Sequence, residues 1–351
     1  MENFNKWASK LSKSGCSSIS FQTKDNLIFW GRNFDFHEWI EGTKGLFIPK
    51  NRIFYTMGNT VENNIDTNTK VKSKHAIAGV GTLITKSTPV LYDGINDCGL
   101  MGGMLYFVNE ARYANEANPG TLPLQAIYVV TYMLSQCSTI DEIQNALKNK
   151  ITIVNKTVVG QNFQLHWIFT DKNNESAILE CTNNDIKLHR NTMGILTNSP
   201  NYSWQKKNLY QYKNINNTPN KPFYINGEQI NPYCTGTSEH GMPGDWSAPS
   251  RFVRAAILKQ FAIKATGEYQ GVIYLFKMLQ NLQYIKGLVY PIDGKTEYTI
   301  YMTAGCSQTL NYYVSSYESN KIICLQLDKL KDENQIKTFN LPKEPYFEIY
   351  K

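Results

Sequence analysis

The chain has 351 residues, of which 42% are hydrophobic, and this is enough apolar material for a sizeable core in one large domain or two small ones. Its 36 basic and 29 acidic residues leave a formal net charge of +7; the basic residues are scattered, which indicates a solvated surface and argues against a nucleic-acid-binding protein. The 7 cysteines are odd in number and form no CxxC pair, which argues against a disulfide framework and against a zinc site. We therefore expect a protein of a reducing, cytoplasmic compartment that uses no cofactor and no metal.

The first 15 residues form a leader in front of the first predicted strand. They lack the apolar core that a secretory signal needs, and Lys13 stands where a lipoprotein anchor would carry an apolar residue. No run of about 20 apolar residues occurs in the chain, so no membrane-spanning helix is predicted. Phe4, Trp7, Ala8 and Leu11 recur at helical spacing, which predicts a short amphipathic helix within the leader. We expect this helix to lie on the protein surface; the alternative is a helix that binds a membrane surface.

The predicted elements follow one another as strands, helices, strands, helices and strands. A hairpin is expected first, because the turn residues KDN lie between the apolar runs SSISFQT and NLIFWGRNF. This order is not the alternation of a parallel doubly wound sheet, and it favours antiparallel sheets with helices on their outer faces. Further strands are predicted at 75–85, 88–97, 99–107, 165–171, 176–183, 186–191, 297–307, 310–318 and 321–328. Helices are predicted at 122–137, 138–149, 248–264 and 269–283.

The stretch at 206–245 is the least structured part of the sequence. It is rich in Asn, Pro and Gly and carries no clear strand or helix pattern. A stretch of this length inside a compact domain usually serves as a lid or as a contact between subunits.

Cys16 stands at the start of the first predicted strand, directly after the leader. A cysteine attacks as its thiolate, and because a free thiol has a pKa of about 8.5 it needs a base or positive charge nearby. None of the 5 histidines lies in a recognisable Cys–His protease setting. The other available base is the α-amino group of the cysteine itself, with a pKa of about 7.7–8.0, and this route requires cleavage of the Gly15–Cys16 bond. Taken alone, Cys16 could equally be an ordinary buried thiol.

Several blocks of sequence stand in a characteristic order. They are CSS at 16, GRNFDF at 31, VLYDGINDCGLMGGMLYF at 90, GILTNSP at 194, GMPGDWSAPSRFVRAA at 241 and GKTEYTIYMTAGCSQ at 294. Together they resemble the choloylglycine hydrolase family, whose N-terminal-nucleophile enzymes include penicillin V acylases and bile salt hydrolases. The resemblance runs from Cys16 to the last predicted strands.

The resemblance implies an α+β fold, a four-layer αββα sandwich of two antiparallel sheets known as the Ntn-hydrolase fold. It implies one domain over 16–351, formed after removal of 1–15 by autoproteolysis or by a protease, since the leader is longer than in many members. It also implies that 206–245 is an assembly loop that reaches into a neighbouring subunit, and hence a homotetramer.

The resemblance also assigns the site. It makes Cys16 the nucleophile of amide hydrolysis through an acyl-thioester, with its freed amine as the base. Arg32 and Asp35 match the family's R-x-x-D, Asn198 matches its oxyanion-hole asparagine, and Arg251 matches its second active-site arginine. We expect Asp35 to orient the amine, the two arginines to lower the pKa of the thiol, and Asn198 to donate to the oxyanion. Taken singly, Arg32 and Asp35 could form a structural ion pair, Asn198 could be a turn residue and Arg251 could be a surface arginine.

Tyr106 offers a backbone N–H to the oxyanion and stands where penicillin V acylases carry Tyr and bile salt hydrolases carry Asn. This position and the sequences of the blocks favour a penicillin V acylase, which hydrolyses penicillin V to 6-aminopenicillanic acid and phenoxyacetate. N-acyl homoserine lactones are a plausible native substrate class. The alternatives are a conjugated bile salt hydrolase and a non-enzymatic binding member of the fold. Cys98 differs from the residue most common in the family at that position, which is Lys.

Overall fold

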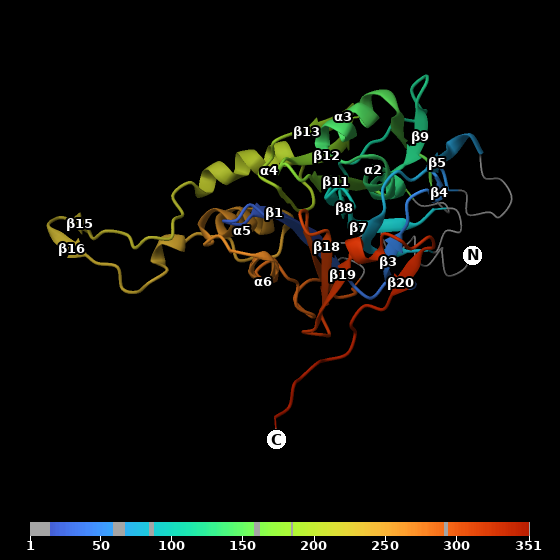
Figure 1. Ribbon diagram of the computed structural model, residues 1–351. Coiled ribbons are helices and arrows are strands. Elements are labelled where there is room, and N and C mark those ends of the chain that lie inside the picture. Colours follow the sequence, from blue (N-terminus) through green and yellow to red (C-terminus); the bar gives the residue numbers. More distant parts are fainter. Residues whose placement is uncertain are drawn as a thin grey trace.

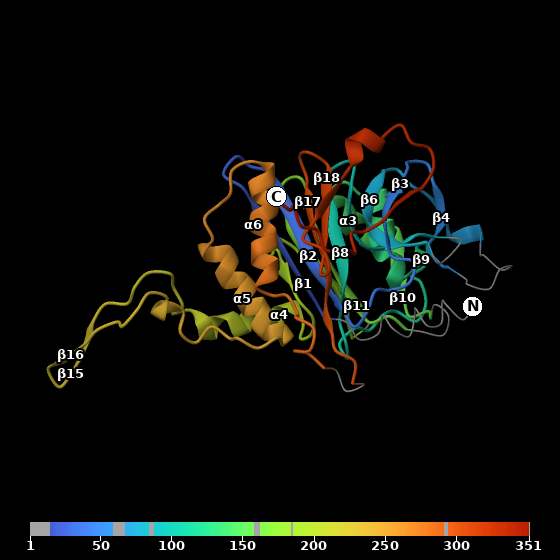
Figure 2. The same ribbon diagram turned by 90° about the horizontal axis from the view of Figure 1, so that it is seen from below.

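The computed structural model describes residues 15–58, 67–83, 88–157, 162–183, 185–290 and 294–350. The surface helix predicted within the leader lies outside these residues. The described chain forms two large antiparallel sheets that face each other, with helices on both outer faces (Figures 1 and 2). This confirms the predicted αββα sandwich.

The first large sheet contains the first two strands of the described chain, β1 and β2. Its strands run in the order β14, β1, β2, β17, β18, β19. The predicted hairpin is confirmed as β1 and β2, in which Cys16 lies opposite Phe34. The bounds are β1 Cys16–Gln22, β2 Ile28–Phe36, β14 Ile195–Leu196, β17 Tyr298–Cys306, β18 Asn311–Ser316 and β19 Ile322–Gln326.

The second large sheet has the order β13, β12, β11, β8, β7, β6, β3, β20, and its neighbouring strands are all antiparallel. The three strands predicted at 165–171, 176–183 and 186–191 are present as β11, β12 and β13, which pair as an antiparallel meander. The bounds are β3 Lys44–Ile48, β6 Ile77–Thr82, β7 Val90–Asn96, β8 Met101–Tyr106, β11 Leu165–Thr170, β12 Ser176–Thr182, β13 Asp185–His189 and β20 Lys337–Phe339.

Helices α5 and α6 pack on the outer face of the first sheet, and α2 packs on the outer face of the second (Figure 2). Thr139 caps the N-terminus of helix α3, and its hydroxyl accepts from the Glu142 N–H. Within the described ranges, no helix is both long and apolar enough to cross a membrane. The bounds are α2 Val129–Gln136, α3 Ile140–Asn149, α4 Tyr202–Asn208, α5 Ala248–Phe261 and α6 Glu268–Gln280, with short 3₁₀ turns at η1 Thr67–Thr69, η2 Ala126–Tyr128, η3 Leu209–Tyr212, η4 Thr237–Glu239 and η5 Leu327–Leu330.

The helix predicted at 122–137 is wrong in its first half. Residues Leu122–Gln125 form strand β9, which pairs in parallel with β10 at Ile151–Val154. Pro123 disfavours the helical conformation of the residue before it, so this apolar run starts as a strand and turns helical only after it. The remaining short strands are β4 Ile53–Tyr55, β5 Lys70–Lys72, β15 Phe223–Ile225 and β16 Glu228–Ile230.

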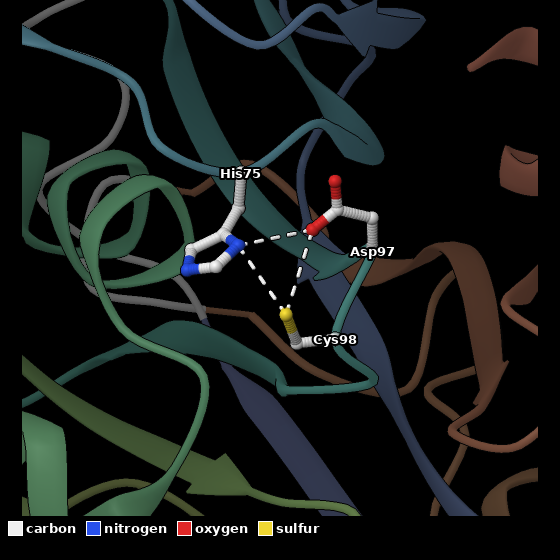
Figure 3. A group of neighbouring side chains, drawn as sticks. All are labelled: His75, Asp97 and Cys98. Carbon is white, nitrogen blue, oxygen red and sulfur yellow. Dashed lines mark hydrogen bonds and ion pairs between the residues drawn. The ribbon is translucent and has the colours of Figure 1, made fainter.

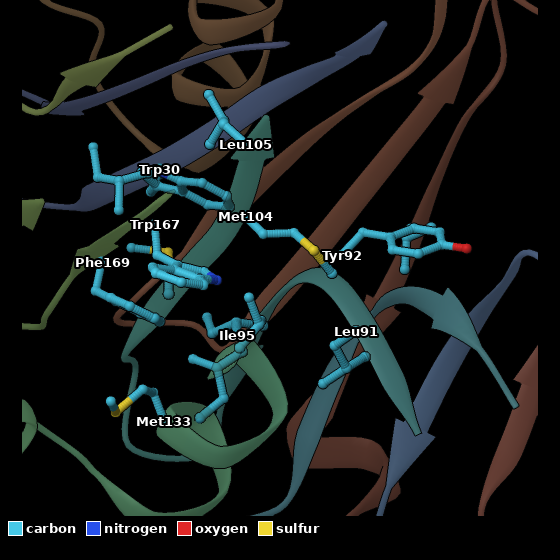
Figure 4. Packing of buried hydrophobic residues seen from close by; sticks show 14 of the residues in the cluster. Trp30, Leu91, Tyr92, Ile95, Met104, Leu105, Met133, Trp167 and Phe169 are labelled. Atoms are coloured by element: carbon cyan, nitrogen blue, oxygen red, sulfur yellow. The ribbon is translucent and has the colours of Figure 1, made fainter. Parts of the chain in front are cut away.

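The hydrophobic core fills the space between the two sheets (Figure 4). Trp30 of β2 lies over β8, so close to Gly103 that a Cβ added there would stand 2.8 Å from the indole ring. Trp167 of β11 and Met104 of β8 form a cross-strand pair, and both side chains are buried, as is Trp30. Every residue of β2 is buried, because this strand is covered by α6 on one face and by the second sheet on the other.

The segment 206–245 extends away from the sandwich and carries the two-stranded ribbon of β15 and β16 at its far end (Figure 1). Its apolar side chains face solvent: Phe223 is 57% exposed, Tyr224 is 65% exposed and Tyr233 is 88% exposed. An arm of this composition fits the expected subunit contact.

Candidate active site

Cys16 opens β1 at the edge of the interior between the two sheets, and only 1% of it is exposed. Its Sγ accepts a hydrogen bond from Arg32 Nη2. Gly15 precedes it and is itself buried; a Cβ at Gly15 would stand 2.9 Å from the Tyr284 hydroxyl. The peptide bond that joins Gly15 to Cys16 therefore lies inside the site, and a residue larger than glycine would not fit without displacing Tyr284.

Arg32 lies on β2, opposite Ser18 of β1, and is fully buried. Its Nη1 donates to the Met104 carbonyl at 2.6 Å and lies 3.7 Å from Asp93 Oδ2. Asp93 is held in turn by the hydroxyls of Tyr301 and Tyr312. Asp93 is not among the predicted site residues, although it lies within the block at 90 that carries the resemblance.

Asp35 lies further along β2 and is also fully buried. The Thr299 hydroxyl donates to its Oδ1, and its Oδ2 lies 3.9 Å from Arg251 Nη1. Among the described residues, Oδ2 has no hydrogen bond. The backbone N–H of Asp35 donates to the carbonyl of Gly15 at 3.1 Å. Burial raises the pKa of the Asp35 carboxyl, while Arg251 and Thr299 oppose that rise.

Asn198 follows β14 in the loop that leads to α4. Its Oδ1 accepts from the Cys16 N–H at 2.9 Å, and its Nδ2 donates to the Tyr106 carbonyl at 2.8 Å. The expected contact of Asp35 with the Cys16 nitrogen is therefore absent from the uncleaved chain, because that nitrogen is a peptide N–H directed at Asn198. A side chain with two firm hydrogen bonds inside the site is more than a turn residue.

Tyr106 ends β8, next to Asn198. The Phe107 N–H donates to the Gln164 carbonyl, which makes the adjacent pair of Tyr106 and Leu165 a non-hydrogen-bonded one. The Tyr106 N–H and carbonyl therefore point away from β11, on the side where Asn198 lies. Burial raises the pKa of the Tyr106 hydroxyl, and Glu297 adds to this rise.

Arg251 reaches the site from the first turn of α5 and is only 1% exposed, which excludes a surface role. Its Nη1 donates to the Cys16 carbonyl and to Ser17 Oγ, and its Nη2 donates to Asn198 Oδ1 at 2.7 Å. Its Nε donates to the Trp246 carbonyl. Arg251 thus ties the first strand, the Asn198 loop and α5 together.

The expected lowering of the thiol pKa needs a correction for the uncleaved chain. Burial raises the pKa of Cys16, and this outweighs Arg32 and Arg251, which lower it; the Asp35 carboxylate adds to the rise. The physical reason is that a thiolate loses its hydration in this closed interior. A base is therefore required, and the arginines alone do not produce a thiolate here.

A second buried network lies behind the Asn198 loop and was also missed. His166 Nε2 lies 2.9 Å from the Thr197 carbonyl, and its Nδ1 lies 3.3 Å from Glu180 Oε1. Glu180 Oε2 lies 3.2 Å from His189 Nε2, and Oε1 also accepts from the Tyr202 N–H at 2.9 Å. The His166 ring therefore links Glu180 of β12 to the backbone just before Asn198.

Comparisons with known proteins place this geometry in a family. The model described as linear amide C–N hydrolases, choloylglycine hydrolase family, matches residues 16–339. The bile salt hydrolase/transferase of Clostridium perfringens is 30% identical over 331 residues, which are 93% of this chain and 97% of that protein. The bile salt hydrolase/transferase of Lactiplantibacillus plantarum is 30% identical over 315 residues, 89% of this chain and 92% of that protein.

Two solved structures agree in fold. A mutant of the conjugated bile acid hydrolase from Clostridium perfringens has a TM-score of 0.86 and 27% identity, and the match covers 96% of this chain and 100% of that one. Penicillin V acylase from Agrobacterium tumefaciens has a TM-score of 0.72 at 21% identity, covering 92% of this chain and 90% of that one, and this likeness supports the fold alone.

The predicted family is confirmed, but the predicted nearness to penicillin V acylase is not. The chain is more similar to the bile salt hydrolases in both sequence and structure, so the comparisons favour what the sequence offered as the alternative. A single residue such as Tyr106 is a weak guide to substrate, because many other side chains shape an acyl pocket. This chain belongs to the choloylglycine hydrolase family of linear amide C–N hydrolases.

Proposed function

We propose that the protein hydrolyses the amide bond of conjugated bile salts, with Cys16 as the nucleophile once residues 1–15 have been removed. The observation that carries the chemistry is the convergence on Cys16 of Arg32, Asn198 and Arg251, each held by buried hydrogen bonds. The similarity to bile salt hydrolases over nearly the whole chain supports the substrate.

Removal of the leader supplies the missing base. Attack of Cys16 Sγ on the Gly15 carbonyl breaks the Gly15–Cys16 bond, leaves Gly15 as a thioester and returns a proton to the departing Cys16 nitrogen. Water then hydrolyses this thioester and frees the thiol. The hydrogen bond from the Asp35 N–H to the Gly15 carbonyl oxygen supports autoproteolysis, since it stabilises the charge that develops there. Cleavage by another protease is the alternative.

After cleavage, the carboxylate of Asp35 can accept a hydrogen bond from the α-amino group of Cys16. Asp35 Oδ2 is a buried carboxylate oxygen that has no hydrogen bond within the described part of the chain, at the place where the chain passes from Gly15 to β1. The neutral amine accepts the thiol proton, Sγ attacks the substrate carbonyl, and the resulting ammonium protonates the departing glycine or taurine nitrogen. Water hydrolyses the acyl-thioester and releases the bile acid. We assign the oxyanion to the side-chain amide of Asn198 and the N–H of Tyr106.

Penicillin V is the second candidate substrate, because the sequence carries Tyr106 at the position discussed above. The two substrates share the chemistry, an amide cleaved through an acyl-thioester, and differ in the acyl group that the pocket must hold. N-acyl homoserine lactones belong to the same comparison, as amides with an apolar acyl chain.

The test is a side-by-side measurement of kcat/KM for taurine- and glycine-conjugated bile salts, penicillin V and an N-acyl homoserine lactone. We expect bile salts to be turned over at least about tenfold faster than the others, and Cys16→Ser to abolish turnover of all of them. A preference for penicillin V would contradict the proposed substrate but would be consistent with the proposed mechanism. Substantial activity in Cys16→Ser would overturn the mechanism, and no activity in a correctly cleaved protein would favour a non-enzymatic binding member.

A further inference from the structure

A second group of reactive side chains lies at the other end of β8 from Tyr106. His75, Asp97 and Cys98 converge there from two loops (Figure 3). His75 Nδ1 lies 3.0 Å from Asp97 Oδ1 and 3.3 Å from Cys98 Sγ, and Sγ lies 3.7 Å from Asp97 Oδ1. The side chains of His75 and Asp97 are each 17% exposed, so the group is sheltered but within reach of solvent.

Strand pairing builds this cluster. Ile77 of β6 lies opposite Asn96 of β7, so the residues just before β6 and just after β7 meet where these two strands end. The N–H of Asp97 donates to the Ala76 carbonyl at 3.0 Å, which extends the pairing by one step. The N–H of His75 donates to the Ser135 carbonyl at the end of α2, which anchors the loop that carries the imidazole.

The three atoms have the separations of metal ligands. A tetrahedral zinc ion lies about 2.0–2.3 Å from imidazole nitrogen, carboxylate oxygen and thiolate sulfur, which sets those atoms roughly 3.3–3.6 Å apart. The measured separations of 3.0, 3.3 and 3.7 Å need adjustments of only a few tenths of an ångström. Three protein ligands leave a fourth position for water or for another ligand.

The surroundings of Asp97 hold it in place for this role. Its second oxygen, Oδ2, accepts from Lys50 Nζ at 2.9 Å and from the Ala76 N–H at 3.1 Å. Those bonds leave Oδ1 directed at His75 and Cys98, in the manner of the outer hydrogen bonds that orient metal-binding carboxylates. A metal would replace the Cys98 thiol proton and require the His75 tautomer with its proton on Nε2.

From this geometry we propose that His75, Asp97 and Cys98 bind one zinc-class divalent ion, at a site separate from Cys16. Imidazole and thiolate ligands select zinc-like ions over magnesium or calcium, which prefer oxygen ligands throughout. The pattern escapes a search by sequence spacing because His75 is 23 residues from Cys98 and no second ligand pair accompanies it.

The test is titration of the purified full chain with Co²⁺, a spectroscopic substitute for zinc, in the Cys16→Ser background. That background removes the thiol of an N-terminal cysteine, which would otherwise chelate metal together with its amine. We expect one Co²⁺ per chain, with a near-ultraviolet sulfur-to-cobalt charge-transfer band and visible bands typical of four coordination. Zinc should displace the cobalt, and should raise the melting temperature of the protein.

Matched variants locate the site. Cys98→Ala and His75→Gln should each weaken binding by more than about a hundredfold, since even outer hydrogen-bond partners of metal ligands account for about 10–100-fold. Cys234→Ser, which changes an exposed cysteine on the arm, should bind as the parent does. Circular dichroism confirms that each variant is folded. Absence of the charge-transfer band, or its persistence at full affinity in folded Cys98→Ala, would overturn the proposal.

Discussion

Replacing Asn198 by alanine tests the proposed oxyanion site. The change removes three hydrogen bonds at once: the acceptor of the Cys16 N–H, the acceptor of Arg251 Nη2 and the donor to the Tyr106 carbonyl. Loss of one oxyanion donor costs about 2.7–4 kcal/mol of transition-state stabilisation, which lowers kcat about 10²–10³-fold.

The same change affects stability, and the two effects need separate measurements. Leaving buried partners without Asn198 costs about 1–3 kcal/mol, less than the total stability of about 5–15 kcal/mol that native proteins have. Urea unfolding measures the loss of stability. The loss of kcat is measured by bile salt turnover, followed through the release of free glycine or taurine. Intact mass shows whether the leader has been removed from each variant.

Asn198→Asp is the matched variant. Its carboxylate keeps an acceptor for Arg251 and for the Cys16 nitrogen, but it has no N–H to donate. We expect Asn198→Asp to keep more of the stability than Asn198→Ala, yet to lose turnover to a similar extent. A folded, leader-free Asn198→Ala enzyme with kcat within tenfold of the parent would refute the reasoning.

Three further outcomes are expected. Gly15→Val should block release of the leader, because its side chain would collide with Tyr284; a normal cleavage rate by intact mass would contradict this, and Gly244→Ala, at a glycine with open space around it and no positive φ, is the control. The hydrogen bonds of Glu180 lower its pKa to about 2, so its stabilisation, roughly 3 kcal/mol, is present above about pH 4.5 and is lost as the pH falls toward 2. Urea unfolding should therefore show a smaller loss of stability between pH 5 and pH 2.5 in Glu180→Gln than in the parent, and equal losses would contradict the assignment. Light scattering should show a homotetramer that Phe223→Ser weakens, whereas a parent protein that is monomeric at micromolar concentration would exclude the assembly role of the arm.

Much of the fold could be predicted from local pattern. The turn residues after β1, the Thr139 cap of α3 and the short apolar runs of β11 and β12 are signals within a few residues of one another. The helix predicted from residue 122 is wrong in its first half because a short apolar run is compatible with a buried strand as well as a buried helix, and because Pro123 disfavours a helical conformation at Leu122.

The site could be predicted only through the resemblance, because its contacts are far apart in sequence. Arg251 reaches the Cys16 carbonyl across 235 residues, and Thr299 reaches Asp35 across 264. Local pattern carries no information on such pairs. His166 could have been noticed only with the strand register in hand, since it faces Glu180 across β11 and β12.

The direction of the shift in the pKa of the Cys16 thiol could not be predicted without knowing how deeply the thiol is buried. Counting two arginines near Cys16 predicts a lowered thiol pKa, but the closed interior reverses the direction. The same burial explains why the mechanism depends on an internal base and on removal of the leader.

The measurement that tests the central claim most directly is the intact mass of the catalytically active protein. We expect that every active molecule begins at Cys16, with residues 1–15 absent. Full amidase activity in molecules that still carry Gly15 on Cys16 would contradict it, because their Cys16 nitrogen is a peptide nitrogen and cannot take the thiol proton.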